Sequence, residues 1–149
     1  MRNLDPVTGK YIPNDAEKKL INALRSGKYR QGFEYLHPDG EFCCLGVACD
    51  IFKEDKADWE ATNNYYGFIQ NSIFGEIKIL PQNVLDWLDW ADERGRTLIK
   101  TKNGLPLQED TYHLAELNDS AVFSFNHIAD IIEAGLIRHK GESYDATES

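Results

Sequence analysis

Residues 33–53 read FEYLHPDGEFCCLGVACDIFK, and they contain both kinds of secondary structure that we expect in this chain. Two aromatic-rich runs, Phe33–Leu36 and Glu41–Cys44, flank a Pro-Asp-Gly sequence at residues 38–40. Proline presets one φ angle of a turn and glycine tolerates a left-handed one, so the pattern is typical of a β-hairpin. Small and apolar residues follow from Leu45 to about Lys53, which predicts that the second strand runs directly into a helix.

Helical patterns also occur on both sides of this stretch. Asn14 is expected to cap a helix with acidic residues in its first turn, an apolar stripe at Leu20, Ile21 and Leu24, and a stop at Gly27. Further short helices are predicted after Pro81, around Leu114 and Leu117, and from Ser124 to Gly135.

Two more hairpins complete the predicted fold. Residues 65–79 alternate weakly, and Asn103-Gly104 separates two short runs within residues 97–108, as in a type I′ turn. We therefore expect one compact α+β domain of four to five short helices, with two or three β-hairpins forming a small antiparallel sheet. Residues 1–13 would be an extended arm, residues 14–138 the domain, and residues 139–149 a flexible polar tail.

Length and charge narrow the class of protein. A chain of 149 residues is long enough for one well-packed domain. No apolar run approaches the ~20 residues of a membrane helix, and no apolar segment near Met1 could serve as a secretion signal, so we expect a cytoplasmic protein without membrane contact. The formal net charge of −9 disfavours direct binding to DNA or RNA, which requires cations facing phosphates.

Cys43, Cys44 and Cys49 lie within seven positions. An odd number of cysteines argues against a disulfide framework, and neither they nor the four scattered histidines have the spacing of a zinc site. Small buried hydrophobic residues are the simpler interpretation of these thiols. We therefore expect neither a metal nor a cofactor.

A basic segment in this acidic chain is the first candidate ligand site. Arginine and lysine bind phosphate, tyrosine stacks on a base, and flanking glycines let backbone amides approach an anion. The alternative is a helix C-terminus whose cations match the helix dipole. Asn118 and Asp119 would add polar contacts, or instead satisfy backbone groups where two helices meet. The proposed ligand-binding residues are Arg25, Lys28, Tyr29, Arg30, Gln31, Asn118 and Asp119.

A cysteine at a helix start is the second candidate. The helix dipole lowers the pKa of such a thiol and makes it more nucleophilic. Cys44, His113 and Asn118 follow one another in the order found in papain-like hydrolases, although a chain with four histidines offers some such order by chance. We keep them as a runner-up catalytic set, with a binding protein favoured over an enzyme.

Four blocks together resemble a family of small uncharacterised phage-encoded proteins: LRSGKYRQG at 24–32, FCCLGVACD at 42–50, Leu80-Pro81 before a helix, and LAELND at 114–119 followed by FNHIAD at 125–130. The chain departs from that pattern in residues 54–79 and 121–123. The resemblance implies an accessory protein of the host-cell cytoplasm that acts as a counter-defence factor.

Three functional hypotheses follow. The favoured one is a non-enzymatic binding protein that sequesters a small anionic, nucleotide-like ligand. The second is an acidic inhibitor of a host defence protein, or a nucleic-acid mimic, acting through Asp50–Glu60 and Asp86–Glu93. The third is a papain-like hydrolase based on Cys44. A homo-oligomer is compatible with each of them.

Overall fold

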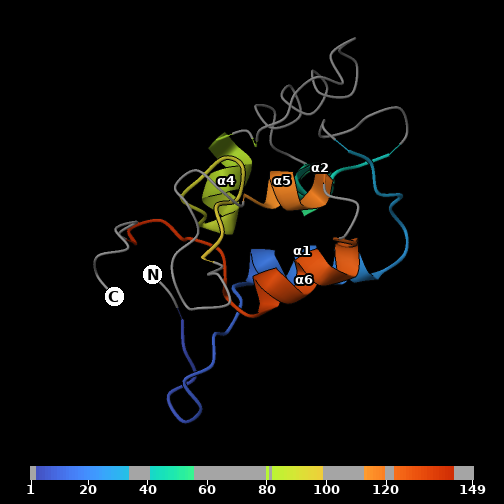
Figure 1. The fold of residues 1–149 in the computed structure, drawn as a ribbon. Coiled ribbons are helices and arrows are strands. Elements are labelled where there is room, and N and C mark those ends of the chain that lie inside the picture. The colour runs from blue at the N-terminus through green and yellow to red at the C-terminus, as the bar shows by residue number, and fades with distance from the viewer. Residues whose placement is uncertain are drawn as a thin grey trace.

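A computed structural model describes residues 3–33, 41–55, 80, 82–98, 113–119 and 123–142 (Figure 1). Within these ranges the chain forms five α-helices: α1 Asp15–Arg25, α2 Cys44–Asp55, α4 Gln82–Leu88, α5 Leu114–Asp119 and α6 Phe125–Glu133. Helices were predicted at all five places. None of the helices in these ranges is long and apolar enough to cross a bilayer.

The predicted α+β class is wrong, because the described ranges contain isolated β-bridges and no β-strand. Phe42, in the second arm of the first predicted hairpin, pairs with Gln31, which precedes the first arm, and this bridge is parallel, whereas a hairpin requires antiparallel pairing. The Phe42 nitrogen donates to the Arg30 carbonyl over 2.8 Å, and its carbonyl accepts from the Gly32 nitrogen over 2.7 Å. Cys44, expected at the end of a strand, is the first residue of α2. The turn of this hairpin lies outside the described residues.

The other two predicted hairpins fall mostly outside the described residues, which omit 65–79 and 99–112. Thr97, expected to begin one of them, forms an antiparallel bridge with Ile137. The neighbouring Leu98 nitrogen donates to the Leu136 carbonyl over 2.8 Å. The segment after α4 is thus paired with the segment after α6, a contact that local turn patterns do not predict.

The first helix forms for the reasons its sequence indicates. The side chain of Asn14 accepts from the Glu17 nitrogen, and the Glu17 side chain accepts from the Asn14 nitrogen, which completes a capping box. Gly27, one residue beyond the C-cap Ser26, has a φ of 77°. The predicted N-cap and stop of this helix are confirmed.

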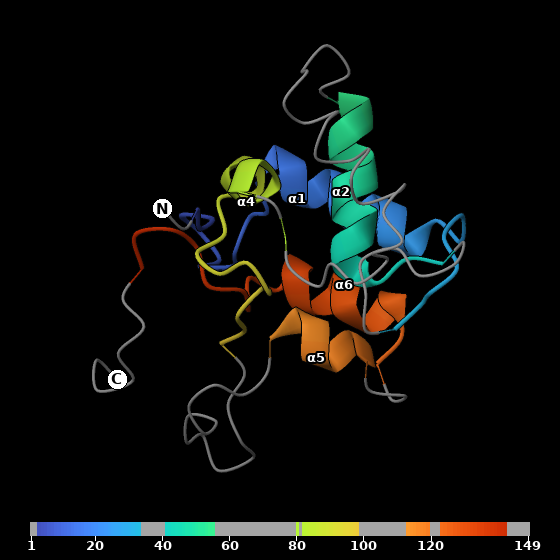
Figure 2. The ribbon, with the colours of Figure 1, turned by 90° about the horizontal axis from the view of Figure 1, so that it is seen from above.

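The core lies between two layers of helices (Figure 1). Helices α1 and α6 lie side by side in one layer, while α2, α4 and α5 lie over them, with α2 crossing α1 (Figure 2). The predicted apolar faces of α1 and α6 are buried between these layers, together with the three cysteines. At full burial an aliphatic side chain contributes roughly 1.5–3 kcal/mol, so these faces account for much of the stability.

Helix α4 ends abruptly. Asp89 adopts a φ of 62°, which is uncommon for a residue other than glycine. This left-handed turn directs the next residue, Trp90, into the core, where it is 0% exposed. The same turn positions one side of the site described next.

Candidate functional site

Glu17 is a fully buried carboxylate, 0% exposed, in the first turn of α1. One of its oxygens accepts from Trp90 Nε1 over 2.9 Å and lies 2.8 Å from His139 Nε2. The other accepts from the Asn14 nitrogen over 3.0 Å and from the Tyr11 hydroxyl. Both oxygens are therefore saturated by donors, as a buried charge requires.

The pKa of Glu17 reflects two opposing effects. Burial raises it, but hydrogen bonds from His139, Tyr11, Trp90 and the Asn14 backbone outweigh burial and hold the pKa below its ordinary value of 4.5. The carboxylate is thus ionised at neutral pH. Burying it is costly unless the four donors remain in place, so it fixes their positions.

One ring hydrogen of His139 can be placed from its hydrogen-bond neighbours. Its Nε2 lies 2.8 Å from the Tyr11 oxygen and 2.8 Å from Glu17 Oε2. Because the Tyr11 proton is donated to the other oxygen of Glu17, Nε2 must carry a hydrogen to face both atoms. Nδ1 is buried without a hydrogen-bond partner, and the Glu142 carboxylate lies 3.9 Å from it.

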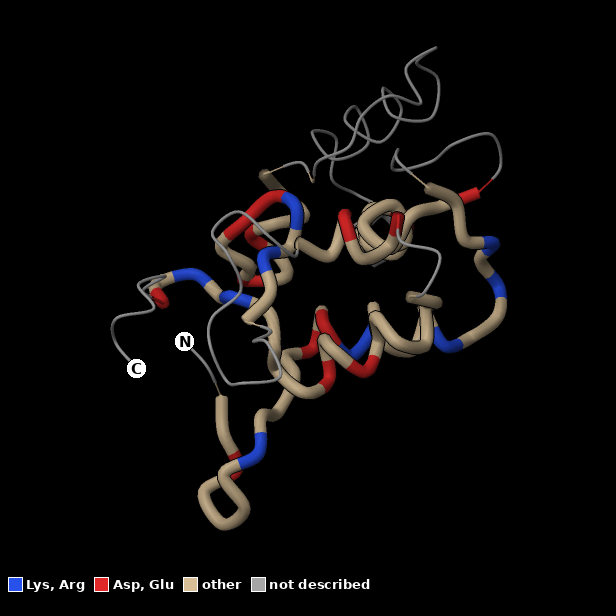
Figure 3. Tube along the Cα trace, viewed as in Figure 1, with Lys and Arg blue, Asp and Glu red and all other residues tan. Residues whose placement is uncertain are grey.

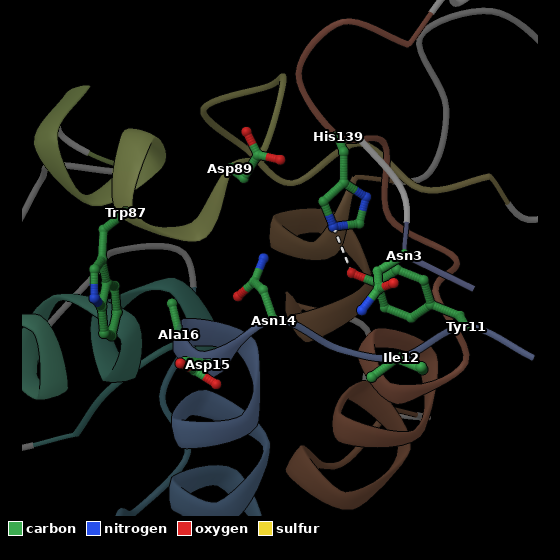
Figure 4. A pocket seen from close by; sticks show the side chains of 9 residues that line it. All are labelled: Asn3, Tyr11, Ile12, Asn14, Asp15, Ala16, Trp87, Asp89 and His139. Atoms are coloured by element: carbon green, nitrogen blue, oxygen red, sulfur yellow. Dashed lines mark hydrogen bonds between the residues drawn. The ribbon is translucent and has the colours of Figure 1, made fainter. Parts of the chain in front are cut away.

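A pocket of about 300 Å³ opens beside this network. Figure 4 shows Tyr11 and His139 together on one side and Trp87 on the other, with Asn14 and Asp89 between them. Polar and aromatic side chains predominate in its wall. The lining residues are Asn3, Tyr11, Ile12, Asn14, Asp15, Ala16, Trp87, Asp89 and His139.

Sequence reasoning missed this site. Glu17 was interpreted only as a first-turn acid that suits the helix dipole, and His139 was placed at the start of a polar tail, whereas it is 1% exposed. One signal was present: Glu17 lies three and four positions before Leu20 and Ile21, on the apolar stripe of α1. A carboxylate on such a stripe requires buried donors, but the sequence does not say which residues provide them.

The predicted anion site is largely engaged in internal contacts. The guanidinium of Arg25 bonds to Asp130 over 2.7 Å and to Glu133 over 2.9 and 3.1 Å, and these bonds raise its pKa. Two carboxylates therefore already compete for its charge. The Tyr29 hydroxyl donates to Asp50 over 2.6 Å, so it too has an internal partner.

Asn118 has the structural role that was weighed against ligand binding. It is 0% exposed, its Oδ1 accepts from the Cys44 nitrogen and from Gln31 Nε2 over 3.1 Å each, and its Nδ2 donates to the Gly32 carbonyl over 2.8 Å. It thus joins the end of α5, the start of α2 and the preceding loop. Asp119, beside it, is exposed.

Lys28 and Arg30, like Arg25, are exposed. They lie on the loop that leaves α1, where Figure 3 shows Lys and Arg positions along one edge of the molecule. Neither makes an ion pair with the residues that the structure describes. They follow the C-terminus of α1, whereas the pocket lies at its N-terminus, about 16 Å away at 1.5 Å per residue.

The runner-up catalytic set is only partly brought together. Cys44 is 1% exposed, and burial raises the pKa of its thiol well above the ordinary value; burial likewise raises that of Cys43 to about 12. His113 lies one residue before α5, and its ring bonds to Glu116 over 2.8 Å. This arrangement does not favour a thiolate nucleophile at Cys44.

The acidic surface of the second hypothesis is described in part, since residues 56–79 lie outside the described ranges. Asp86 is paired with Lys140, and Asp92 accepts from the Arg94 nitrogen over 2.8 Å. Glu93 is exposed.

In the described ranges, the fold and site define a small helical domain with a buried, hydrogen-bonded carboxylate behind a pocket lined by polar and aromatic side chains. The chain belongs to the family described as a domain of unknown function, DUF8296, whose model matches residues 13–136. That span includes Glu17 and Trp90, while Tyr11 and His139 flank it. Neither a curated protein nor a solved structure matches the chain.

Proposed function

We propose that the protein is a non-enzymatic binding domain that holds a small polar ligand in the pocket beside Tyr11 and His139. The observation that carries this proposal is that both side chains are fixed by the same fully buried carboxylate, Glu17. A wall whose side chains are already ordered loses little conformational entropy when a ligand binds.

The hydrogen bonds of the wall favour binding over catalysis. The Tyr11 proton and the Nε2 hydrogen of His139 are both directed at Glu17, so neither is available to a reacting group. The network also has a structural role, because it joins the N-terminal arm to α1, Trp90 and the segment after α6. A structural role alone does not require a hollow beside it.

A pair of tryptophan substitutions tests the location of the site. Asn3 is exposed and lines the pocket, whereas Val7, on the same arm, is 90% exposed and lies outside it. In a thermal-shift screen of small polar compounds, hits should raise the melting temperature of the wild type and of Val7→Trp, and should lose this effect in Asn3→Trp. Hits that act equally on both variants would place the ligand elsewhere.

A second candidate function is supported by the exposure of Lys28 and Arg30. We keep nucleotide-like anions as ligands for this pair, which would act as point charges on a phosphate. Titration with cyclic nucleotides and ADP-ribose should then show binding that weakens in Lys28→Ala and Arg30→Ala. The matched control is Lys18→Ala, an exposed lysine on α1. Equal affinity in all three variants argues against this site.

The resemblance to phage-encoded proteins adds a biological setting to the proposal. It supports a counter-defence role in the cytoplasm of an infected host, where the domain would sequester a signal or bind a defence protein. Expression in a defence-proficient host should restore phage plating, and Asn3→Trp should abolish the restoration if the pocket is responsible. Unchanged plating with the wild type argues against the role.

A further inference from the structure

The formally charged side chains in the described pocket wall are all negative. Of the nine described lining residues, two are aspartates, Asp15 and Asp89, and none is lysine or arginine. The ionised Glu17 lies behind the same wall. Two lysines adjoin lining residues in the chain, Lys10 next to Tyr11 and Lys140 next to His139. Neither lines the pocket, and Lys140 directs its ammonium to Asp86, which does not line it either.

Three hydrogen-bond donors in the wall are already engaged by other groups of the protein. Asn14 Nδ2 donates to the Leu88 carbonyl over 3.0 Å, and the Tyr11 hydroxyl and His139 Nε2 are directed at Glu17. An anion in this pocket would meet the carboxylates of Asp15 and Asp89, and no lysine or arginine among the described residues lines the pocket to compensate its charge. Carboxylate oxygens, in contrast, have several lone pairs each and can accept further donors.

The aromatic side chains also favour a positively charged ligand. Trp87 and Tyr11 line opposite sides of the hollow, as Figure 4 shows. Ring faces attract cations, with a contribution of roughly 0.5–2 kcal/mol depending on desolvation. A volume of about 300 Å³ is at the lower end of the range for small-molecule sites and suits a molecule of amino-acid size.

A metal ion fits less well than an organic cation. Among the described residues, no group of three His, Cys, Asp or Glu side chains is placed to hold a metal. Hard divalent cations require about six oxygen ligands, whereas an ammonium or guanidinium needs only a few acceptors and tolerates ring faces. From the two aspartates, the absence of lysine and arginine from the described lining and the two aromatic rings, we infer that the pocket binds a small organic cation carrying an ammonium or guanidinium group. This inference rests on the proposed function.

A matched pair of probes tests whether the pocket prefers a positively charged ligand. Putrescine and 1,4-butanediol have similar length and shape, but only the first is cationic. Calorimetric titration should show that putrescine and agmatine bind the wild type, with butanediol at least about tenfold weaker, a difference of ~1.4 kcal/mol. Inorganic phosphate and AMP should not bind at the pocket.

Substitutions identify the carboxylates that act. The double variant Asp15→Asn and Asp89→Asn removes two charges, and asparagine tolerates the left-handed backbone at position 89. It should weaken putrescine binding by about tenfold or more. Glu93→Gln removes an exposed charge outside the pocket and should leave the affinity unchanged.

Three outcomes separate this inference from the proposed function. Selective diamine binding that is lost in the double variant supports both. Butanediol or phosphate binding that equals diamine binding, is lost in Asn3→Trp and is unchanged in the double variant overturns the inference and leaves the pocket as the binding site. If no probe of any charge moves the NMR signals of Tyr11, Trp87 or His139, both are overturned.

Discussion

The indole nitrogen of Trp90 donates a hydrogen bond to the carboxylate of Glu17 over 2.9 Å, and the two residues are 73 positions apart in the chain. Both are 0% exposed. The bond fixes the segment after α4 to the first turn of α1, and His139 reaches the same carboxylate from the segment after α6. One buried charge therefore holds together the wall of the candidate site.

Replacing Glu17 by glutamine tests this role. Glutamine has the same shape, but its amide nitrogen cannot accept, so at least one of the four donors loses its partner. We expect the free energy of unfolding, measured by urea denaturation, to fall by about 2–3 kcal/mol.

Glu93→Gln is the control, because Glu93 is exposed, and it should change stability by less than about 0.5 kcal/mol. A Glu17→Gln protein as stable as the wild type would show that the network contributes little. Failure of the variant to fold agrees with the expectation.

Acid should remove the contribution of Glu17 to the free energy of unfolding. Burial raises the pKa of this carboxyl, but hydrogen bonds from His139, Tyr11 and Trp90 lower it by a larger amount. The folded-state pKa therefore lies below 4.5. A group of this kind stabilises the protein above its unfolded-state pKa, and the contribution is lost as the pH falls through the folded-state pKa. The stability difference between wild type and Glu17→Gln should be largest above about pH 5 and should shrink towards about pH 3.

Other carboxyls with lowered pKa values, including Asp86, Glu116 and Glu133, are present in both proteins, so their effects cancel in this difference. A difference that stays constant from about pH 6 to about pH 3 would contradict a lowered pKa of Glu17 in the folded protein.

Two glycines with the same backbone provide a matched test of how Tyr11 is seated. Gly135 and Gly27 have φ angles of 76° and 77°. A Cβ at Gly135 would meet the ring of Tyr11, whereas a Cβ at Gly27 would meet open space. Gly27→Ala should cost about 1–2 kcal/mol for the left-handed conformation alone.

Gly135→Ala should cost a further 1–3 kcal/mol, roughly the cost of overpacking, and should displace Tyr11 from the pocket wall. The measurement is urea denaturation of both variants together with the chemical shifts of Tyr11. Equal costs at the two positions would mean that the N-terminal arm moves away from the added methyl group without further loss of stability.

Thiol labelling tests the hydrolase hypothesis. Burial raises the pKa of Cys43 from 9.0 to about 12, and the thiols of Cys44 and Cys49 are also buried with raised pKa values. The thiolate fraction of Cys43 at neutral pH falls on the order of a thousandfold, so native labelling should be far slower than that of free cysteine. Unfolding in urea should expose all three thiols. Rapid labelling of native Cys44 would support a nucleophilic cysteine.

Elements set by neighbouring residues could be predicted from the sequence. Asn14 and Gly27 delimit α1, and Ser124 caps α6, because caps and stops depend on residues within a few positions. The α+β prediction was wrong for the described residues because a turn pattern does not say which distant segment a run of residues pairs with. Phe42 meets Gln31 in a parallel bridge, and Thr97 meets the distant Ile137.

The site depended on contacts that no local pattern reveals. Glu17 satisfies the capping rule equally well on a surface, and its burial is decided by Trp90 and by His139, 122 positions away. The basic segment was found from its composition, but Arg25 has carboxylate partners on α6 more than a hundred residues away.

NMR titration of the ¹⁵N-labelled protein with putrescine tests the central claim most directly, through the indole signals of two tryptophans. Trp87 lines the pocket, whereas Trp90 is fully buried against Glu17. We predict that the Trp87 signal shifts saturably in the wild type and in Val7→Trp, more than that of Trp90, and does not shift in Asn3→Trp. A Trp87 signal that stays in place in the wild type, with putrescine and with the neutral and anionic probes alike, would contradict the account.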